Sequence, residues 1–257
     1  MKKFFCIPIL YLIALQSYGL ESKELSALMG RSQAFDRGVP LSATVEAEIV
    51  HPKNESEVMK YKMYTTRTDK KILVMIDFFY PDTYDGTRIL TTVPEEGGVP
   101  SVSVKLKLFF TSVDIPNVKP DMSFFGMDFD SGDMNPRNPL FDTYSILSTE
   151  KFPDGNTCYV VEALPLDDSP YYKTIHYVDA DRELIMKSEM YNKKNKLVKI
   201  FEVVEVEKIQ GIWTVTEAKM TSVKTNSCTT LVYSNITYGE DNSPYVTKNF
   251  LKTGELK

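Results

Sequence analysis

The strands predicted in the second half of the chain carry apolar side chains on both faces. The segment 170–220 reads as three or four strands in succession, joined by the charged turns "DADRE" and "NKKNK". In the strand after the first turn, Tyr191 faces the side opposite Met186 and Met190, because successive side chains point to opposite faces. A sheet with one solvated face would alternate apolar and polar residues cleanly. Both faces of this sheet therefore need cover.

The first 19 residues, "MKKFFCIPILYLIALQSYG", have the layout of a secretory signal peptide. Two lysines precede a short apolar run, and small residues stand at Ser17 and Gly19, as in a cleavage region. The run is shorter than the ~20 residues that a membrane-spanning helix needs. We expect cleavage after Gly19 and export of the remaining chain. Residues 20–257 would then form one domain.

Charge and cysteine content narrow the classes of partner. The chain has a formal net charge of −5 at pH 7, and it has no block of basic residues. Since binding to a phosphate backbone depends on clustered lysine and arginine, we expect no nucleic-acid partner. Two cysteines follow the predicted signal peptide, Cys158 and Cys228. Both lie in predicted strands, and they could form a disulfide in an exported protein or remain two buried thiols.

One helix and a long series of strands are predicted. Residues 21–35 form the clearest helix, with Leu25, Leu28, Met29 and Phe35 along one side. Most of the remaining sequence is extended and shows no repeat, linker or break in composition. We predict a mainly β (α+β) fold in which ~9–12 antiparallel strands form one large sheet. Twist would curl such a sheet into an incomplete β-barrel.

The middle of the chain, residues 111–147, departs from this pattern. It contains several prolines and no regular period, yet it also contains Phe124, Phe125, Phe129 and Phe141. A long irregular segment with so many rings must cover an apolar surface, or it would expose those rings to water. We predict that this irregular or helical segment and the N-terminal helix cover the concave face of the sheet. They would either fill it or leave a cavity for an apolar ligand.

The inventory of reactive side chains argues against an enzyme. After the signal peptide the only histidines are His51 and His176, and no G-x-S-x-G motif is present. We expect His176 to be exposed or on an edge strand. Two histidines and two separated cysteines cannot make a structural zinc site, and we expect no cofactor. An esterase is a third class of function, which would require a nucleophile with a base within reach.

The segment "DFDSGDMNPRN" resembles a calcium loop only superficially. Its aspartates are Asp128, Asp130 and Asp133. The glycine falls one place early for an EF-hand, and Pro139 occupies the position of the bidentate glutamate. We expect these aspartates to order turns instead of binding a metal.

Several segments follow one another with recognisable spacings. "PDTYDGTRIL" supplies Pro81, Gly86, Thr87 and Leu90, and "SFFGMDFDSGDM" supplies Ser123, Phe124, Gly126, Asp128, Phe129 and Asp133. Later matching positions are Tyr159, Glu162, Pro165, Ser169, Pro170, Tyr171, Lys173, Val178, Asp179, Lys187, Tyr191, Lys199 and Trp213. In this order they resemble the LolA-like outer-membrane lipoprotein-sorting proteins, from the helix near Leu25 to Phe250.

This resemblance implies an incomplete β-barrel covered by helices, with an apolar cavity that holds the acyl chains of lipoproteins or lipids. Together with the two-faced strands, it leads us to predict a monomeric, non-enzymatic periplasmic carrier for outer-membrane sorting. Its further partners would be an inner-membrane transporter or an outer-membrane acceptor. The predicted lining residues are Leu25, Leu28, Met29, Phe124, Phe125, Phe129, Met186, Met190, Phe201 and Trp213. The alternative is a cell-envelope protein that docks on a transporter or an outer-membrane protein through its phenylalanine-rich middle segment.

Overall fold

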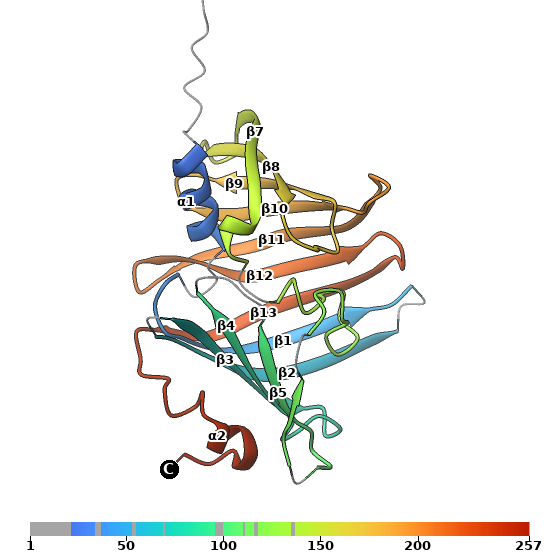
Figure 1. Cartoon of the computed structure of the whole chain (residues 1–257), viewed down its shortest axis with the longest axis vertical. Helices are drawn as coiled ribbons and strands as arrows, with labels where there is room; N and C mark the ends of the chain where they lie inside the picture. The colour runs from blue at the N-terminus through green and yellow to red at the C-terminus, as the bar shows by residue number, and fades with distance from the viewer. Residues whose placement is uncertain are drawn as a thin grey trace, which may run out of the picture.

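One antiparallel sheet of 13 strands dominates the computed structural model (Figure 1). The structure describes residues 22–256, apart from 34–36, 53–54, 69, 96–99, 110, 116–117 and 135–136. The strands are β1 (Leu41–Val50), β2 (Ser56–Arg67), β3 (Lys71–Tyr80), β4 (Arg88–Pro94), β5 (Ser101–Lys105), β6 (Val113–Ile115), β7 (Asp142–Lys151), β8 (Thr157–Pro165), β9 (Lys173–Asp179), β10 (Leu184–Tyr191), β11 (Leu197–Ile209), β12 (Ile212–Ser222) and β13 (Ser227–Tyr238). Two helices, α1 (Ser22–Gln33) and α2 (Lys248–Thr253), and a 3-10 turn, Pro139–Phe141, complete the described elements.

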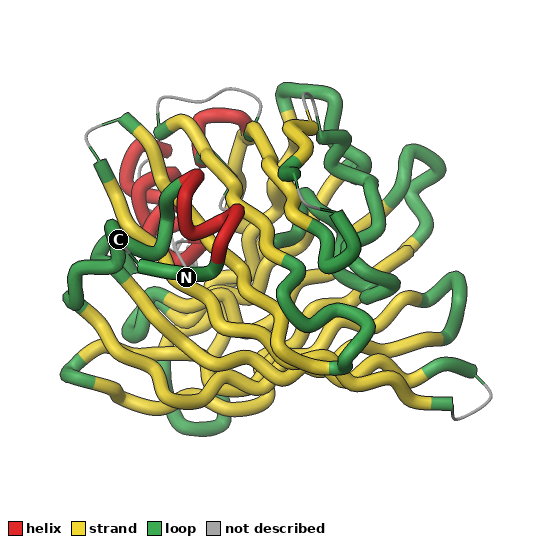
Figure 2. The backbone as a smooth tube through the Cα atoms, turned by 90° about the horizontal axis from the view of Figure 1, so that it is seen from below, coloured by secondary structure: helices red, strands yellow, loops and turns green. Residues whose placement is uncertain are grey.

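The sheet consists of two meanders, β1–β6 and β7–β13, which are joined by the pairing of β1 with β13. Reading across the sheet, β6 to β1 are followed directly by β13 and then by β12 to β7. In the β1–β13 pair, Leu41 lies opposite Tyr238 and Ile49 opposite Thr229. β6 and β7 remain as free edges, so the sheet curves around an interior without closing (Figure 2). The predicted mainly β, curled and incomplete barrel is confirmed, with 13 described strands instead of the expected 9–12.

The convex face of the sheet is covered at one end by the C-terminal segment. Met75 of β3 and Leu90 of β4 are buried there against Phe250 and Leu251 of α2. Thr247 caps the helix by accepting a hydrogen bond from the Phe250 backbone N–H at 3.0 Å. The helix α2 was not predicted from the sequence, and α2 supplies part of the cover that the two-faced strands required.

The helix α1 covers the concave face at the opposite end of the sheet (Figure 1). Leu25, Leu28 and Met29 are buried and pack against Val161 of β8 and Val178 of β9. The predicted helix is therefore present, although Phe35 and the predicted signal peptide lie outside the described residues. In the described part of residues 22–256, neither helix has the length and apolarity to cross a membrane.

The predicted irregular middle segment is shorter than expected, because its last part is a strand. Residues Asp142–Lys151 form β7 at the sheet edge, with Tyr144 and Ile146 packed towards the core. Alternation of these residues with polar ones, over too few positions to stand out in the sequence, accounts for the strand. The segment 118–134 does lack helices and long strands, and apart from one isolated bridge, Ser123 to Asp130, it is turns and bends.

Candidate functional site

The concave face is not filled by protein side chains. A first cavity of about 360 Å³ lies above the central strands, between the sheet, α1 and the segment 118–134. Its volume falls within the range of ordinary small-molecule sites. The apolar part of its wall includes Ala43 (β1), Met63 (β2), Ile76 (β3), Leu231 (β13), Ala218 and Met220 (β12), Phe201 (β11) and Met190 (β10).

A second cavity of about 550 Å³ lies beside the first, between β3–β6 and the segment 118–134. The two cavities share Val74, Ile76 and Met134 in their walls, so they are neighbours on one concave surface. Leu106 and Phe109 in the wall of the second cavity are 40% and 56% exposed. The apolar interior of this cavity therefore continues onto an exposed apolar surface.

The predicted lining residues fall into three groups. Phe129, Met190, Phe201 and Trp213 line the first cavity, and Phe124 and Phe125 line the second. Leu25, Leu28, Met29 and Met186 line neither cavity. Contact of these ten residues with a lipid stays a prediction.

Two local features explain the residues that miss the cavities. The apolar side of α1 is consumed by packing against Val161 and Val178, so the helix presents Ser32 and Gln33 to the first cavity instead. On β10, an irregularity in register between Ile185 and Lys187 breaks the two-residue period at Met186. A strand read as regular from the sequence could not reveal that shift.

The paired phenylalanines of the middle segment point inward. Phe125 has a left-handed backbone (φ 52°), and Gly126 follows with φ 78°. This turn directs the Phe125 ring against Phe78 at 4.8 Å and Tyr84 at 5.3 Å between ring centroids. Both rings are thus part of the core around the second cavity and not a free docking surface.

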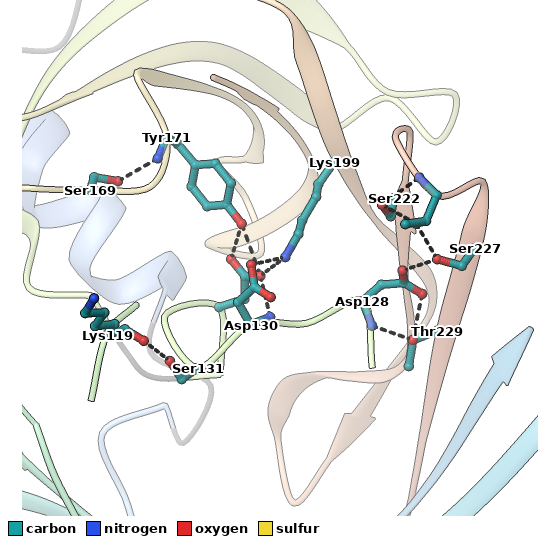
Figure 3. Close-up of polar contacts among 12 residues, drawn as sticks. Lys119, Asp128, Asp130, Ser131, Ser169, Tyr171, Lys199, Ser222, Ser227 and Thr229 are labelled. Carbon is teal, nitrogen blue, oxygen red and sulfur yellow. Dashed lines mark hydrogen bonds and ion pairs between the residues drawn. The ribbon is translucent and has the colours of Figure 1, made fainter. Parts of the chain in front are cut away.

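Asp128 fixes the segment 118–134, called the cover segment below, to the sheet at β13. Its carboxylate accepts hydrogen bonds from the hydroxyls of Ser227 and Thr229, the latter at 2.9 Å (Figure 3). The Asp128 backbone N–H donates to the Thr229 hydroxyl at 2.8 Å. All three residues are buried, so the contact ties the segment tightly to the concave face.

A second anchor joins the same segment to β11. The Lys199 ammonium lies 2.6 Å from an Asp130 carboxylate oxygen and 2.8 Å from one of Asp133 (Figure 3). The Tyr171 hydroxyl donates to Asp133 at 2.9 Å. Burial, with a further contribution from the Asp133 charge, raises the pKa of Tyr171 well above its ordinary value. Burial also raises the pKa of Asp130, although Lys199 opposes this shift.

The aspartates of the calcium-like segment are thus engaged by protein groups. They bind two hydroxyls of β13 and the ammonium of Lys199 on β11. The Asp133 carboxylate also orders the turn by accepting a hydrogen bond from the Asp130 backbone N–H at 2.9 Å. Across the described residues, no cluster of three or more histidine, cysteine, aspartate or glutamate side chains could hold a metal ion. The resemblance marked Asp128, Asp133, Tyr171 and Lys199 as matching positions but gave them no role. The feature of the sequence that could have revealed this anchor is Lys199, a lysine on the apolar face of a predicted strand.

The prediction that His176 is exposed or on an edge strand is wrong. β9 lies between β8 and β10, and the His176 ring lines the first cavity. Its Nδ1 is 2.8 Å from the Ser188 hydroxyl on the neighbouring strand. Burial lowers the pKa of His176 to about 4, with a smaller opposing effect of Asp142 and a reinforcing one of Arg137. The imidazole is therefore neutral at pH 7.

The Ser188–His176 pair has the separation of a nucleophile and its base. No further part of a hydrolytic site accompanies it among the residues that the structure describes. Asp142, the carboxylate whose charge acts on His176, is held by Arg137 at 2.6 Å and by Tyr144 at 3.2 Å. Among the described residues, no carboxylate bonds the histidine to orient it. The depressed pKa also makes the ring a weak base.

Replacing His176 by glutamine is expected to remove part of the acid sensitivity of the fold. Because the folded-state pKa is about 4 and the unfolded value about 6.5, only the unfolded chain binds this proton between those values. The contribution of the neutral His176 ring to the free energy of unfolding is therefore complete above pH 6.5 and is lost as the pH falls towards 4. Between pH 7 and 5.5 we expect wild type to lose about 1 kcal/mol more than His176→Gln, measured by urea unfolding. Equal losses would contradict the buried neutral ring.

The two cysteines are free thiols, so the possible Cys158–Cys228 disulfide is not formed. Cys158 is on β8 and Cys228 on β13, with β9, β10, β11 and β12 between them. Five strand spacings amount to roughly 24 Å along the sheet. A disulfide requires Cα atoms within about 7 Å. Burial raises the pKa of both thiols.

A sequence model of a protein family, described as "-like: Uncharacterized protein", matches residues 70–253. The chain belongs to this family. The matched range extends from the start of β3 through α2 and contains both anchors of the cover segment. No curated protein matches the chain.

Three solved structures share the fold of this family member. A DUF1329 family protein from Desulfovibrio piger is 23% identical, with a TM-score of 0.78 over 92% of this chain and 99% of its own. A candidate outer membrane lipoprotein-sorting protein domain from Vibrio parahaemolyticus is 21% identical, with a TM-score of 0.80 over 90% and 99%. A LolA superfamily protein from Nitrosomonas europaea is 16% identical, with a TM-score of 0.70 over 91% and 100%. The predicted LolA-like resemblance is confirmed as a shared fold.

Proposed function

We propose that the chain is a periplasmic carrier that binds acyl chains of lipids or lipoproteins for outer-membrane sorting. The observation that supports this most is the unfilled concave face, with its cavity of about 360 Å³ and a neighbouring one of about 550 Å³. Each methylene moved from water into such a space contributes ~0.8 kcal/mol. The similarity to a candidate lipoprotein-sorting domain supports the same class of cargo.

The proposal includes export and a role without catalysis. Residues 1–19 would direct export and be removed, and residues 20–257 would work as one domain. The neutral, weakly basic His176 and its engaged neighbour Asp142 favour binding over hydrolysis. The Ser188–His176 pair would then serve as a polar part of the cavity wall.

Lipid carried by the protein itself tests the proposal. We expect mass spectrometry of organic extracts from protein purified without detergent to find acyl lipids in near-stoichiometric amount. A fluorescent fatty-acid probe should also gain intensity on binding, since the cavity wall is apolar. Recovery of no lipid, together with no probe binding, would contradict the carrier function.

Docking on another envelope protein is the second candidate function. The docking surface expected from the sequence includes Phe124 and Phe125, but the rings of these residues pack inward. The exposed apolar residues beside the second cavity support it better, because Leu108 and Phe109 are 86% and 56% exposed. A Leu108→Ser variant that keeps probe binding but fails to sort cargo would assign this surface to docking.

A further inference from the structure

Hydrogen-bonding side chains gather at one end of the first cavity, beside the end of α1. Ser32 and Gln33 from the last turn of α1 line this end together with His176 and Ser188. Gln33 is within hydrogen-bonding reach of Tyr144, whose hydroxyl donates to Asp142 at 3.2 Å. The helix therefore brings its polar end, and not its apolar side, to the interior.

Two buried polar atoms at this end have no protein partner among the described residues. They are the Ser32 hydroxyl and the Gln33 side-chain oxygen, and they share the cavity wall with His176, whose Nδ1 is engaged by the Ser188 hydroxyl. Ser32 is only 9% exposed, so its hydroxyl is removed from bulk water. A buried polar group without a hydrogen bond destabilises the fold. A ligand that supplies partners here would recover that loss on binding.

The charges of the described residues around these atoms balance, so they do not attract an anionic ligand. The Arg137 guanidinium is bound by Asp142 at 2.6 Å and by Asp167 at 2.7 Å, and the Arg37 guanidinium in the wall offsets the second carboxylate. Arg37 also contributes to the wall, and it donates to the backbone carbonyls of Arg31, Arg182 and Glu183. His176 adds no charge at neutral pH, because burial lowers its pKa to about 4.

We propose that this end of the cavity binds an uncharged lipid head with a hydroxyl group, while the acyl chain lies along Met190, Phe201 and Met220. A hydroxyl can donate to the Gln33 oxygen and accept from Ser32, which no alkyl or carboxylate head can do. A monoacylglycerol has this chemistry. The inference rests on the proposed carrier function and narrows its cargo to lipids with neutral, hydroxylated heads.

Three ligands with the same chain test the head preference. Monopalmitoylglycerol has a neutral hydroxylated head, methyl palmitate keeps the ester but has no hydroxyl, and palmitate is an anion. We expect monopalmitoylglycerol to displace the fluorescent fatty-acid probe at about tenfold lower concentration than either of the others, as two hydrogen bonds would give. Equal displacement, or tightest binding of palmitate, would overturn the inference and leave the carrier function standing. Failure of all three ligands and of the probe would instead count against the carrier function.

Matched variants assign the preference to residues. In Ser32→Ala, Gln33→Leu the advantage of monopalmitoylglycerol over methyl palmitate should fall to within about twofold, because both head partners are lost. Met190→Ala in the apolar wall should weaken all three ligands by the same factor. If the double variant does not fold, Ser32→Ala alone should reduce the advantage about threefold. An unchanged advantage in the folded variants would overturn the assignment of these residues.

Discussion

Replacing Lys199 by methionine is expected to lower the free energy of unfolding by about 3–5 kcal/mol. The Lys199 ammonium is the cation between Asp130 and Asp133, and its side chain is only 12% exposed. Methionine keeps the apolar stem but leaves two neighbouring carboxylates without their partner in a half-buried site. Urea unfolding at pH 7.5 measures the loss. The loss should be smaller at pH 4, because burial raises the pKa of Asp130 and its protonation relieves the repulsion between the two carboxylates.

An exposed ion pair on the same sheet provides the control. Lys60 lies 2.6 Å from Glu46, but these side chains are 38% and 47% exposed. Lys60→Met should therefore cost less than about 1 kcal/mol. If both lysine variants lose the same stability, the anchor between β11 and the cover segment does not stabilise the fold as inferred.

The general architecture could be predicted because it follows from local periodicity. Alternation along β1 buries Leu41, Val45 and Ile49 on one face, and the spacing of apolar residues in α1 gives one packed side. The helix α2 was missed because six residues carry too little periodic pattern. Its position depends on a surface of β3 and β4 that exists only after the sheet has formed.

The site was less predictable, because its important contacts join distant segments. Asp128 meets Ser227 and Thr229 about a hundred positions later in the chain, so no local spacing relates them. His176 was misplaced because its sequence context shows a strand but not the number of strands on each side of it. β9 is an inner strand because β8 and β10 pair with it on both sides, and the edge position is taken by β7, which the sequence did not show as a strand.

Replacing Ala218 by tryptophan should reduce the affinity for an acyl chain about a hundredfold. Ala218 is on β12 near the middle of the sheet, lines the first cavity and lies opposite Leu231 of β13. An indole at this position occupies space that three or four methylenes would otherwise use. At ~0.8 kcal/mol for each methylene, their exclusion costs about 3 kcal/mol of binding free energy. Titration with the fluorescent fatty-acid probe measures the change.

A tryptophan on the other face of the same strand pair is the control. It shows whether lower affinity comes from a smaller cavity or from damage to the fold. Val232 of β13 pairs with Glu217 beside Ala218, and its side chain is 41% exposed. Val232→Trp adds a large ring outside the cavity, so probe affinity should stay within about twofold of wild type. Circular dichroism and the unfolding midpoint establish that both variants fold, since overpacking a core costs about 1–3 kcal/mol. Undiminished affinity in a folded Ala218→Trp protein would show that the chain does not lie in the first cavity, and the neighbouring cavity lined by Val104 would become the site to block.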